Sequence, residues 1–233
     1  MTIAENVAAV RANIERAALA AGRDPGEIIL VAATKMNDAD RVRQAIAAGV
    51  DACGENRVQE LVEKNAQGAY EGAALHFIGR LQKNKVNKVV GVAELIHSVD
   101  SIELLAAIDR AACSKGVKQD ILLEINAAGE DSKAGFSPED TASVLSQAAA
   151  MRGICVRGLM TIPPKCASPE ENRPYFFIMK QLFIDNSAKK YDNVSMDFLS
   201  MGMSGDYTAA IACGANMVRV GSAIFGERIY PAR

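Results

Sequence analysis

The sequence of 233 residues has no tryptophan, two histidines and five cysteines. The histidines, His76 and His97, show neither an H-x-x-H nor an H-E-x-x-H spacing, which argues against a metal site built by the protein. The cysteines lie at positions 53, 113, 155, 166 and 213 without a C-x-x-C pair, a pattern that fits neither a disulfide framework nor a zinc site. We therefore interpret them as reduced thiols in the core.

Other absences exclude classes of partner and reaction. The formal charge of −2 lacks the basic excess of proteins that bind nucleic acid or a membrane surface. No apolar run approaches the roughly 20 residues of a membrane span, and the polar, helical amino terminus is unlike a signal peptide, so we expect a cytoplasmic protein. The G-x-S-x-G elbow of a Ser/His/Asp hydrolase is also missing.

What the sequence does contain is a regular alternation of apolar and helical segments. The clearest apolar segment is IILVAATK, Ile28 to Lys35, in which the residues from Ile28 to Ala33 are all apolar. Such a run without polar alternation predicts a strand buried on both faces. Seven further apolar segments predict strands near 50–56 and at 74–79, 93–99, 120–126, 154–160, 196–201 and 216–221.

One helix is predicted before the first strand, and a helix or helical turn is predicted after each of the eight strands, the first of them from Asp38 to Ala48. An amphipathic helix begins after Thr2 and ends at Gly22, and a lysine-rich helix is expected from Leu81 to Val90, its positive face solvated or at most in contact with a partner. Capping signals before helices are Thr2 with Glu5, Asp38, Asp100 with Glu103, Ser137-Pro138, and Ser168-Pro169 with Glu171.

The strict alternation of strands and helices, without a linker or a shift in composition, predicts an α/β fold with parallel strands. Eight such units in a chain of this length suggest one (β/α)8 TIM barrel domain over residues 1–233, with an additional N-terminal helix. A doubly wound open sheet is the alternative.

Polar residues gather at the predicted carboxyl ends of the strands. In a barrel these ends meet at one rim, where the functional groups of barrel enzymes lie. The candidates are Lys35 after the first strand, Glu55 and Asn56 after the second, Arg80, Asn126, Thr161, the segment from Ser200 to Ser204, and the segment from Arg219 to Ser222.

The last two of these segments, SMGMSGD and RVGSAIFG, are rich in small residues and each precedes a helical turn. Such turns present backbone N–H groups to an anion, and barrels commonly bind phosphate after strands seven and eight. Gly221 lets the backbone approach closely, and Ser204 and Ser222 offer hydroxyl groups. The alternative for Ser204 is that it only caps a helix.

A lysine opposite a phosphate site suggests pyridoxal 5′-phosphate, which offers an aldehyde to Lys35 and a phosphate to the loops. A lysine among apolar strands and cationic groups loses proton affinity and becomes nucleophilic. Arg219 would donate to the pyridine nitrogen and leave it unprotonated, because an arginine has no acceptor. The alternative for Arg219 is an ion pair at the end of the barrel.

Several long segments together resemble the pyridoxal phosphate homeostasis protein family, which is similar to the amino-terminal barrel of alanine racemase. They are LVAATK, GENRVQE, HFIGRLQKNK, IHSVDS, INAAGEDSKAGF, RGLMTIPP and LSMGMSGDYTAAIACGANMVRVGSAIFGER, in this order over nearly the whole chain. The resemblance implies a (β/α)8 barrel in which Lys35 holds the cofactor as an aldimine. It further implies that Ser204 with Gly221 and Ser222 holds the phosphate, Arg219 faces the ring nitrogen, and Asn56 lines the cofactor pocket.

One departure from the family pattern is Thr34, where many relatives carry serine; the change keeps a hydroxyl group. Members of the family are described as cofactor carriers that influence vitamin B6 and amino-acid balance, without an established reaction. The resemblance therefore implies a pyridoxal phosphate binding protein of intracellular vitamin B6 homeostasis, with Lys35 as the one candidate for any catalysis.

Racemisation would need acid–base groups on both faces of the substrate carbon. In alanine racemase the second group is a tyrosine supplied with a separate β-domain, for which the predicted barrel leaves no residues before Arg233. Tyr207 is the tyrosine expected to approach the rim, whereas Tyr191 and Tyr230 are expected to be peripheral. The alternative functions are a low-rate amino-acid racemase or lyase that uses Lys35 as its base, and a Schiff-base sugar-phosphate aldolase without a cofactor.

The expected partners are the small-molecule cofactor and pyridoxal phosphate-dependent enzymes that accept it. Neither nucleic acid nor a membrane is expected. We expect a monomer, with a dimer as the alternative.

Overall fold

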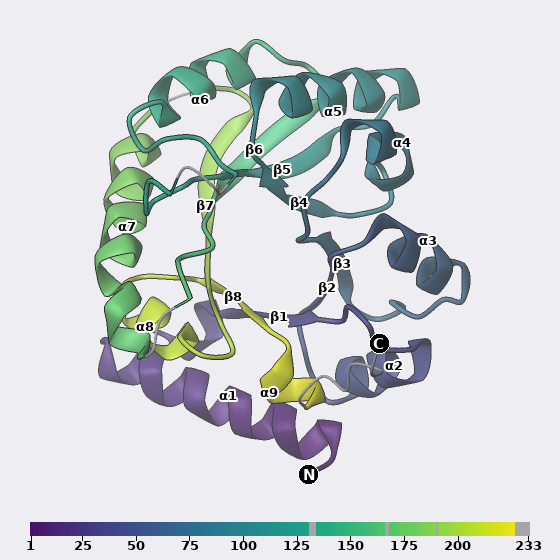
Figure 1. Ribbon diagram of the computed structural model, residues 1–233, viewed down its shortest axis with the longest axis vertical. Coiled ribbons are helices and arrows are strands. Elements are labelled where there is room, and N and C mark those ends of the chain that lie inside the picture. The colour runs from purple at the N-terminus through teal and green to yellow at the C-terminus, as the bar shows by residue number, and fades with distance from the viewer. Residues whose placement is uncertain (131–133, 166–167, 190, 227–233) are drawn as a thin grey trace.

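The computed structural model describes residues 1–130, 134–165, 168–189 and 191–226. In this part of the chain, eight parallel strands close into a barrel in sequence order, β8 pairing with β1 (Figure 1). The strands are β1 (Ile29–Ala33), β2 (Ala52–Glu55), β3 (Ala74–Phe77), β4 (Leu95–Val99), β5 (Gln119–Glu124), β6 (Ile154–Met160), β7 (Val194–Met203) and β8 (Met217–Val220). The prediction of a (β/α)8 barrel is confirmed, and the open-sheet alternative is wrong.

Helices form a ring around the strands (Figure 1). The α-helices are α1 (Ile3–Ala20), α2 (Ala39–Ala47), α3 (Val58–Ala66), α4 (Val86–Val89), α5 (Ile102–Lys115), α6 (Thr141–Ala149), α7 (Arg173–Ser187), α8 (Tyr207–Ala212) and α9 (Ser222–Phe225). Three short 3-10 helices accompany them, η1 (Pro25–Glu27), η2 (Lys83–Lys85) and η3 (Pro169–Asn172). The helix α1 is the predicted additional N-terminal helix, and it packs against α2, α8 and α9.

The strand β1 is apolar throughout because both of its faces are covered. Leu30 and Ala32 belong to the large hydrophobic cluster between strands and helices, whereas Val31 belongs to the smaller cluster inside the barrel. All three side chains are fully buried. Successive residues of a strand point to opposite faces, so a strand between two apolar layers needs no polar alternation.

The ends of several helices follow the predicted capping signals. Thr2 Oγ1 accepts a hydrogen bond from Glu5 N, and Thr2 N donates to the Glu5 carboxylate, which completes the predicted capping box of α1. The Asp38 side chain accepts from Arg41 N at the start of α2. At η3, the backbone N–H of Ser168 donates to the Glu171 carboxylate, as predicted.

Three predicted helix starts are wrong. Ser101 rather than Asp100 caps α5 by accepting from Leu104 N, since Asp100 instead faces Arg80. Ser137 closes a turn by accepting from Asp140 N, and α6 begins only at Thr141. The expected helix from Leu81 to Val90 is shorter, because Leu81 is buried, Gln82 is extended, and the helical turns begin only at Lys83.

The prediction of core thiols is correct in part. Cys53 and Cys213 are buried, but Cys113 is exposed and Cys155 half-buried, so these two are not core residues. All four are free thiols, and Cys166 lies outside the described residues.

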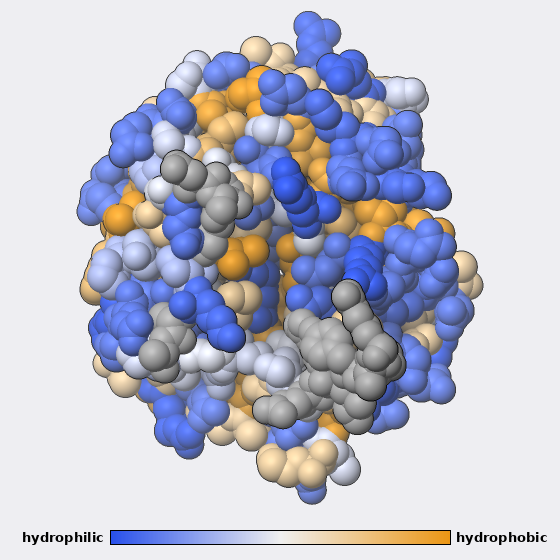
Figure 2. Space-filling model, in the orientation of Figure 1, coloured by the Kyte–Doolittle hydropathy of each residue, from blue (hydrophilic) through white to orange (hydrophobic). Residues whose placement is uncertain are grey.

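Within the described ranges, none of the helices is long and apolar enough to cross a membrane. Figure 2 shows hydrophilic side chains over most of the face seen in Figure 1.

Candidate functional site

The closure of the barrel brings three of the predicted site segments to neighbouring strand ends. Ala33 of β1 pairs with Gly54 of β2, and Ala32 pairs with Val220 of β8. Lys35 therefore follows β1 between Asn56, which follows β2, and the Gly221-Ser222 turn, which follows β8. Because parallel strands keep their register, this adjacency follows from the pairing itself.

Lys35 lies in a tight turn that the surrounding chain fixes. Thr34 N donates to Gly54 O over 3.0 Å, and Asn37 Nδ2 donates to Lys35 O over 3.1 Å. Met36 has a φ of 61°, the only left-handed φ of a non-glycine residue in the described part of the chain. A side chain in this conformation costs free energy and persists where the surroundings impose it. Here Met36 N donates to Glu60 Oε2 over 2.7 Å.

A buried ionic network lies directly behind this turn. Lys64 Nζ donates to Thr34 O over 2.9 Å and to Glu55 Oε1 over 2.7 Å, and it also contacts Glu60 Oε2 at 3.2 Å. Thr34 Oγ1 and the Tyr70 hydroxyl donate to the same Glu55 oxygen over 2.7 and 3.0 Å. The network thus links Thr34, which precedes Lys35, to Glu55 at the end of β2. Through Glu60 it also reaches Met36, which follows Lys35.

Burial dominates the electrostatics of this network. The Glu55 side chain is fully buried and that of Lys64 almost so. Burial, and next the Glu55 charge, raises the pKa of the Cys53 thiol to about 12, and the same two causes raise the pKa of Tyr70. Glu55 was predicted at the rim, whereas Lys64 and Tyr70 were not. A signal for Lys64 was its position four residues after Glu60 on α3, which puts both side chains on one helix face.

Asn56 lies at the edge of the site with unused hydrogen-bonding capacity. Its Oδ1 is buried and has no hydrogen-bond partner among the described residues. A Cβ at Gly79 would lie 2.1 Å from the backbone oxygen of Asn56, so only glycine allows the ends of β2 and β3 to approach this closely. A buried acceptor without a partner is costly in a folded protein, which marks Asn56 as a group that a ligand would satisfy.

The two glycine-bearing loops meet at Ser204. Its Oγ accepts hydrogen bonds from Gly221 N over 3.1 Å and from Ala223 N over 3.4 Å. The alternative that Ser204 only caps a helix is wrong, since α8 begins at Tyr207 and Ser204 bonds across to the next loop. A hydroxyl that accepts from two N–H groups directs its own proton to a third partner, and a phosphate oxygen is such a partner.

Arg219 projects from β8 across the barrel interior towards β6 and β7. It is buried, and its guanidinium donates to Ser200 Oγ over 2.6 Å and to Thr161 O over 2.8 Å. These acceptors are neutral, so the contacts do not support the alternative of an ion pair. Burial lowers the pKa of Arg219 to about 10, which still leaves it protonated at neutral pH. Two of its five N–H donors are thereby used, which leaves donors for a ligand.

A chain of buried hydrogen bonds extends from Arg219 to both histidines. Ser200 Oγ lies 3.1 Å from Nδ1 of His97, and Nε2 of His97 lies 3.1 Å from Nδ1 of His76. Burial lowers the pKa of His76 to about 4 and that of His97 well below its ordinary value, so both rings are neutral at neutral pH. Arg219 can only donate, so Ser200 Oγ accepts from it, and the direction of the bonds that link Ser200, His97 and His76 follows from the tautomers of the two histidine rings.

Glu124, the last residue of β5, is a titratable group that sequence reasoning missed. Burial, followed by the nearby Asp100 charge, raises the pKa of its carboxyl to about 7, against the opposing effects of Arg219 and Arg80. The sequence signal was a carboxylate at the carboxyl end of the apolar segment DILLEIN, whose other carboxylate, Asp120, opens the segment. Asn126, in contrast, serves its own loop: its side chain donates to Glu130 O and accepts from Glu130 N.

Neither Tyr207 nor Tyr191 supplies a group at the rim. The prediction for Tyr207 is wrong, since its hydroxyl accepts from Asn13 Nδ2 of α1 over 2.9 Å, outside the barrel. Tyr191 bridges to Val194 at the start of β7, away from the carboxyl ends, as predicted. Tyr230 lies outside the described residues. Among those residues no cluster of histidine, cysteine or carboxylate side chains is suited to a metal ion.

Comparison with known proteins shows extensive similarity. The family model of the alanine racemase N-terminal domain matches residues 6–229. The pyridoxal phosphate homeostasis protein of Aquifex aeolicus is 39% identical over 230 residues, which cover 99% of this chain and all of that protein.

Two solved structures are similar as well. An unknown protein from Bifidobacterium adolescentis superposes with a TM-score of 0.91 at 37% identity, over 96% of this chain and 94% of that one. PipY of Synechococcus elongatus with pyridoxal phosphate bound gives a TM-score of 0.80 at 33% identity, over 97% of this chain and all of that one.

The buried pair of Lys64 and Glu55 generates a prediction about stability. Lys64→Met leaves the Glu55 carboxylate buried without its cation, so we expect a loss of about 3–5 kcal/mol in the free energy of unfolding, measured with urea. The matched control is Glu55→Gln/Lys64→Met, which removes both charges and keeps an acceptor for Thr34 and Tyr70. We expect it to regain more than half of the loss, and a double variant no more stable than Lys64→Met would contradict the assignment.

The raised pKa of Glu124 generates a prediction about pH. Between about 4.5 and about 7 the folded protein binds a proton at Glu124 that the unfolded chain has released, so this group lowers the stability as the pH rises through that window. Glu124→Gln removes the effect. Relative to wild type, its free energy of unfolding should rise by about 1–3 kcal/mol between pH 5 and pH 8.

Urea unfolding of both proteins at the two pH values measures this difference. Glu139→Gln, which changes an exposed side chain, is the control and is expected to show no such trend. A difference between wild type and Glu124→Gln that stays constant with pH would refute the raised pKa.

Proposed function

Because the chain belongs to the alanine racemase N-terminal domain family, and within it to the pyridoxal phosphate homeostasis protein family, we propose that it binds pyridoxal 5′-phosphate at the rim of the barrel and acts in the homeostasis of this cofactor. The observation that carries the proposal is the strand register that sets Lys35 between Asn56 and the Gly221-Ser222 turn. An amine, an unsatisfied acceptor and an anion-binding turn there match the functional groups of this cofactor.

The phosphate is assigned to the meeting point of the two loops. The N–H groups of Gly221 and Ala223 donate to Ser204 Oγ there, which leaves the Ser204 proton for the phosphate, and the Ser222 hydroxyl adds a second donor. Hydroxyl donors at the start of a helical turn suit a dianion without requiring a lysine. Asn56 is assigned to the cofactor pocket because its buried Oδ1 needs a donor.

Arg219 is assigned to the ring nitrogen of the cofactor. It is buried, protonated and able only to donate, so it leaves that nitrogen unprotonated. When bound, the cofactor supplies an aldehyde and an electron-withdrawing ring, and an unprotonated ring withdraws electrons weakly. The hydrogen-bonded chain through Ser200 to His97 and His76 holds Arg219 in a single orientation.

Lys35 is assigned as the covalent anchor. Its amine adds to the aldehyde carbon and water leaves, which forms a Schiff base. The bonds to Thr34, Met36 and Asn37 fix the turn from which the amine projects. Through reversible holding of the cofactor, the protein would influence amino-acid balance by way of enzymes that depend on it.

Lys35→Ala tests the anchor directly. Loaded wild-type protein should show the absorption band of a Schiff base and, after borohydride reduction, a label on the Lys35 peptide. Lys35→Ala should lose both while keeping the far-ultraviolet circular dichroism of the wild type, because its side chain is only half-buried. Lys85→Ala, at an exposed position, is the control that keeps the band. A label found mainly on Lys83, Lys85 or Lys133 would contradict the assignment.

A second experiment addresses the alternative function as a racemase. A weak electron sink and the direction of the Tyr207 hydroxyl towards Asn13 favour holding over turnover. General acid–base groups contribute typically about 10²–10⁴ in rate, so the loss of one partner leaves at most slow exchange of the α-proton. We expect L-alanine incubated with loaded protein in deuterated buffer to stay almost wholly in the L form. Rapid D-alanine formation that Lys35→Ala abolishes would establish the racemase instead.

A further inference from the structure

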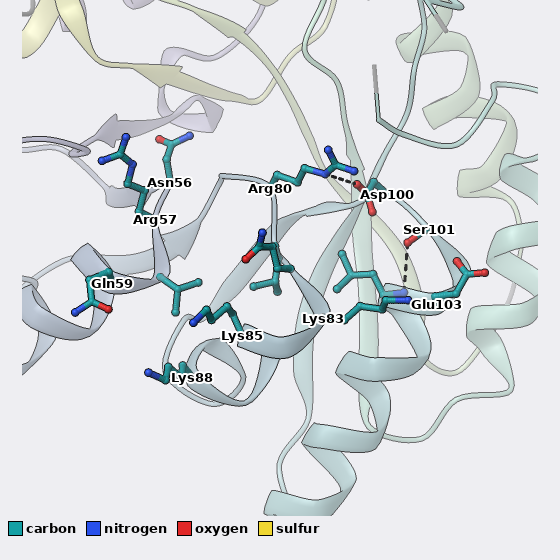
Figure 3. Close-up of a pocket in the computed structure, with 14 residues that line it drawn as sticks. Asn56, Arg57, Gln59, Arg80, Lys83, Lys85, Lys88, Asp100, Ser101 and Glu103 are labelled. Atoms are coloured by element: carbon teal, nitrogen blue, oxygen red, sulfur yellow. Dashed lines mark hydrogen bonds and ion pairs between the residues drawn. The ribbon is translucent and has the colours of Figure 1, made fainter. Parts of the chain in front are cut away.

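A groove of about 760 Å³ lies beside the candidate site, at the carboxyl ends of β2, β3 and β4 (Figure 3). The start of α3, the segment through η2 and α4, and the start of α5 form its walls. It is strongly cationic: the two carboxylates in its lining, Asp100 and Glu103, face five positively charged side chains, which are Arg57, Arg80, Lys83, Lys85 and Lys88.

Most of this positive charge is not neutralised within the protein. Arg57 and Arg80 lie 3.8 Å from Glu60 and Asp100, but their side chains remain 72% and 82% exposed. Lys83, Lys85 and Lys88 are exposed, and they make no ion pair or side-chain hydrogen bond within the described residues. Since the whole chain carries a net charge of −2, the groove concentrates charge of the sign opposite to that of the protein.

The groove is continuous with the candidate cofactor site through Asn56. This residue lines the groove and also follows β2 next to the Lys35 turn. A partner seated in the groove would therefore lie beside Asn56, next to the strand end that carries Lys35.

We propose that the groove is the docking surface for an acidic face of an enzyme that accepts pyridoxal phosphate. The proposal rests on the function proposed above and adds the surface through which the cofactor is handed on. Charge complementarity between a cationic groove and an acidic face speeds encounter and sets orientation more than it adds affinity. Exposed lysines beside the proposed cofactor site suit brief contacts with several acidic enzymes.

The chemistry of the lining argues against two other ligands. Pockets for small anions have a few buried polar groups that converge on the ligand, whereas the cations here are exposed and spread over three structural elements. Surfaces that bind single-stranded nucleic acid interleave basic and aromatic side chains, and no aromatic residue lines this groove. An extended acidic protein surface fits the arrangement better than either.

The test compares two double charge reversals that change the net charge equally. Lys83→Glu/Lys85→Glu alters the groove, and Lys118→Glu/Arg152→Glu alters exposed residues that precede β5 and β6, at the opposite end of the barrel. Fluorescently labelled apo-aminotransferases of acidic isoelectric point are titrated with each protein, without cofactor, at about 0.05 M and about 0.5 M salt.

We expect the groove variant to weaken association about tenfold at low salt and the control variant less than about twofold, with all differences lost at high salt. The neutral variant Lys85→Gln/Lys88→Gln should show a smaller loss in the same direction. Equal effects of the groove and control variants, or no association with any of the acidic apo-enzymes, would overturn the proposal.

A second measurement separates docking from cofactor binding. Loaded protein is mixed either with an apo-aminotransferase or with semicarbazide, which captures released cofactor without docking. The groove variant should slow transfer to the enzyme about tenfold and leave capture by semicarbazide unchanged. Slowing of both by the same factor would place the lysines in the cofactor site and refute docking. Failure of wild-type protein to take up cofactor would refute the proposed function alone, because the association measurement needs none.

Discussion

The closure of the barrel along β1 is the constraint on which the site depends. Because β1 pairs with β2 on one side and β8 on the other, residues from the beginning and the end of the chain become neighbours at one rim. The turn after β1 then needs its own support, since Met36 adopts a left-handed φ. The buried contacts of Lys64 with Thr34 O, Glu55 and Glu60 provide that support. Register thus sets which residues meet, and the network sets the orientation of the turn that carries Lys35.

The fold and the position of Lys35 after β1 could be predicted from the sequence because both depend on local patterns. Few structures other than a buried strand fit the continuous apolar run from Ile28 to Ala33. Likewise, the small residues around Gly221 are typical of a tight turn. Assigning a cofactor and a role to Arg219 needed the resemblance to a known family as well. The direction of the Tyr207 hydroxyl could not be predicted, since it depends on Asn13, almost two hundred residues away in the sequence.

Long-range burial accounts for the other omissions. Lys64, Tyr70 and Glu124 look like ordinary residues of a helix, a turn and a strand, and only the assembled barrel buries the first two and half-buries Glu124. The cost of burying a charge depends on all neighbours at once, so no local sequence pattern reports it. Ser200 was predicted at the end of its strand, but its contacts with Arg219 and His97 also depend on the assembled barrel.

The protein uses positive charge in two physically different ways on the same rim. Arg219 is buried, held by Ser200 and Thr161, and linked to neutral histidines, so its donors stay fixed in direction. Fixed donors discriminate between ligands by geometry. Lys83, Lys85 and Lys88 are exposed and extend over a groove, so their charge acts through a field that salt screens. The proposed holding of one small molecule and the proposed brief contacts with acidic enzymes place opposite demands on rigidity, and buried and exposed cations on one rim would meet them separately.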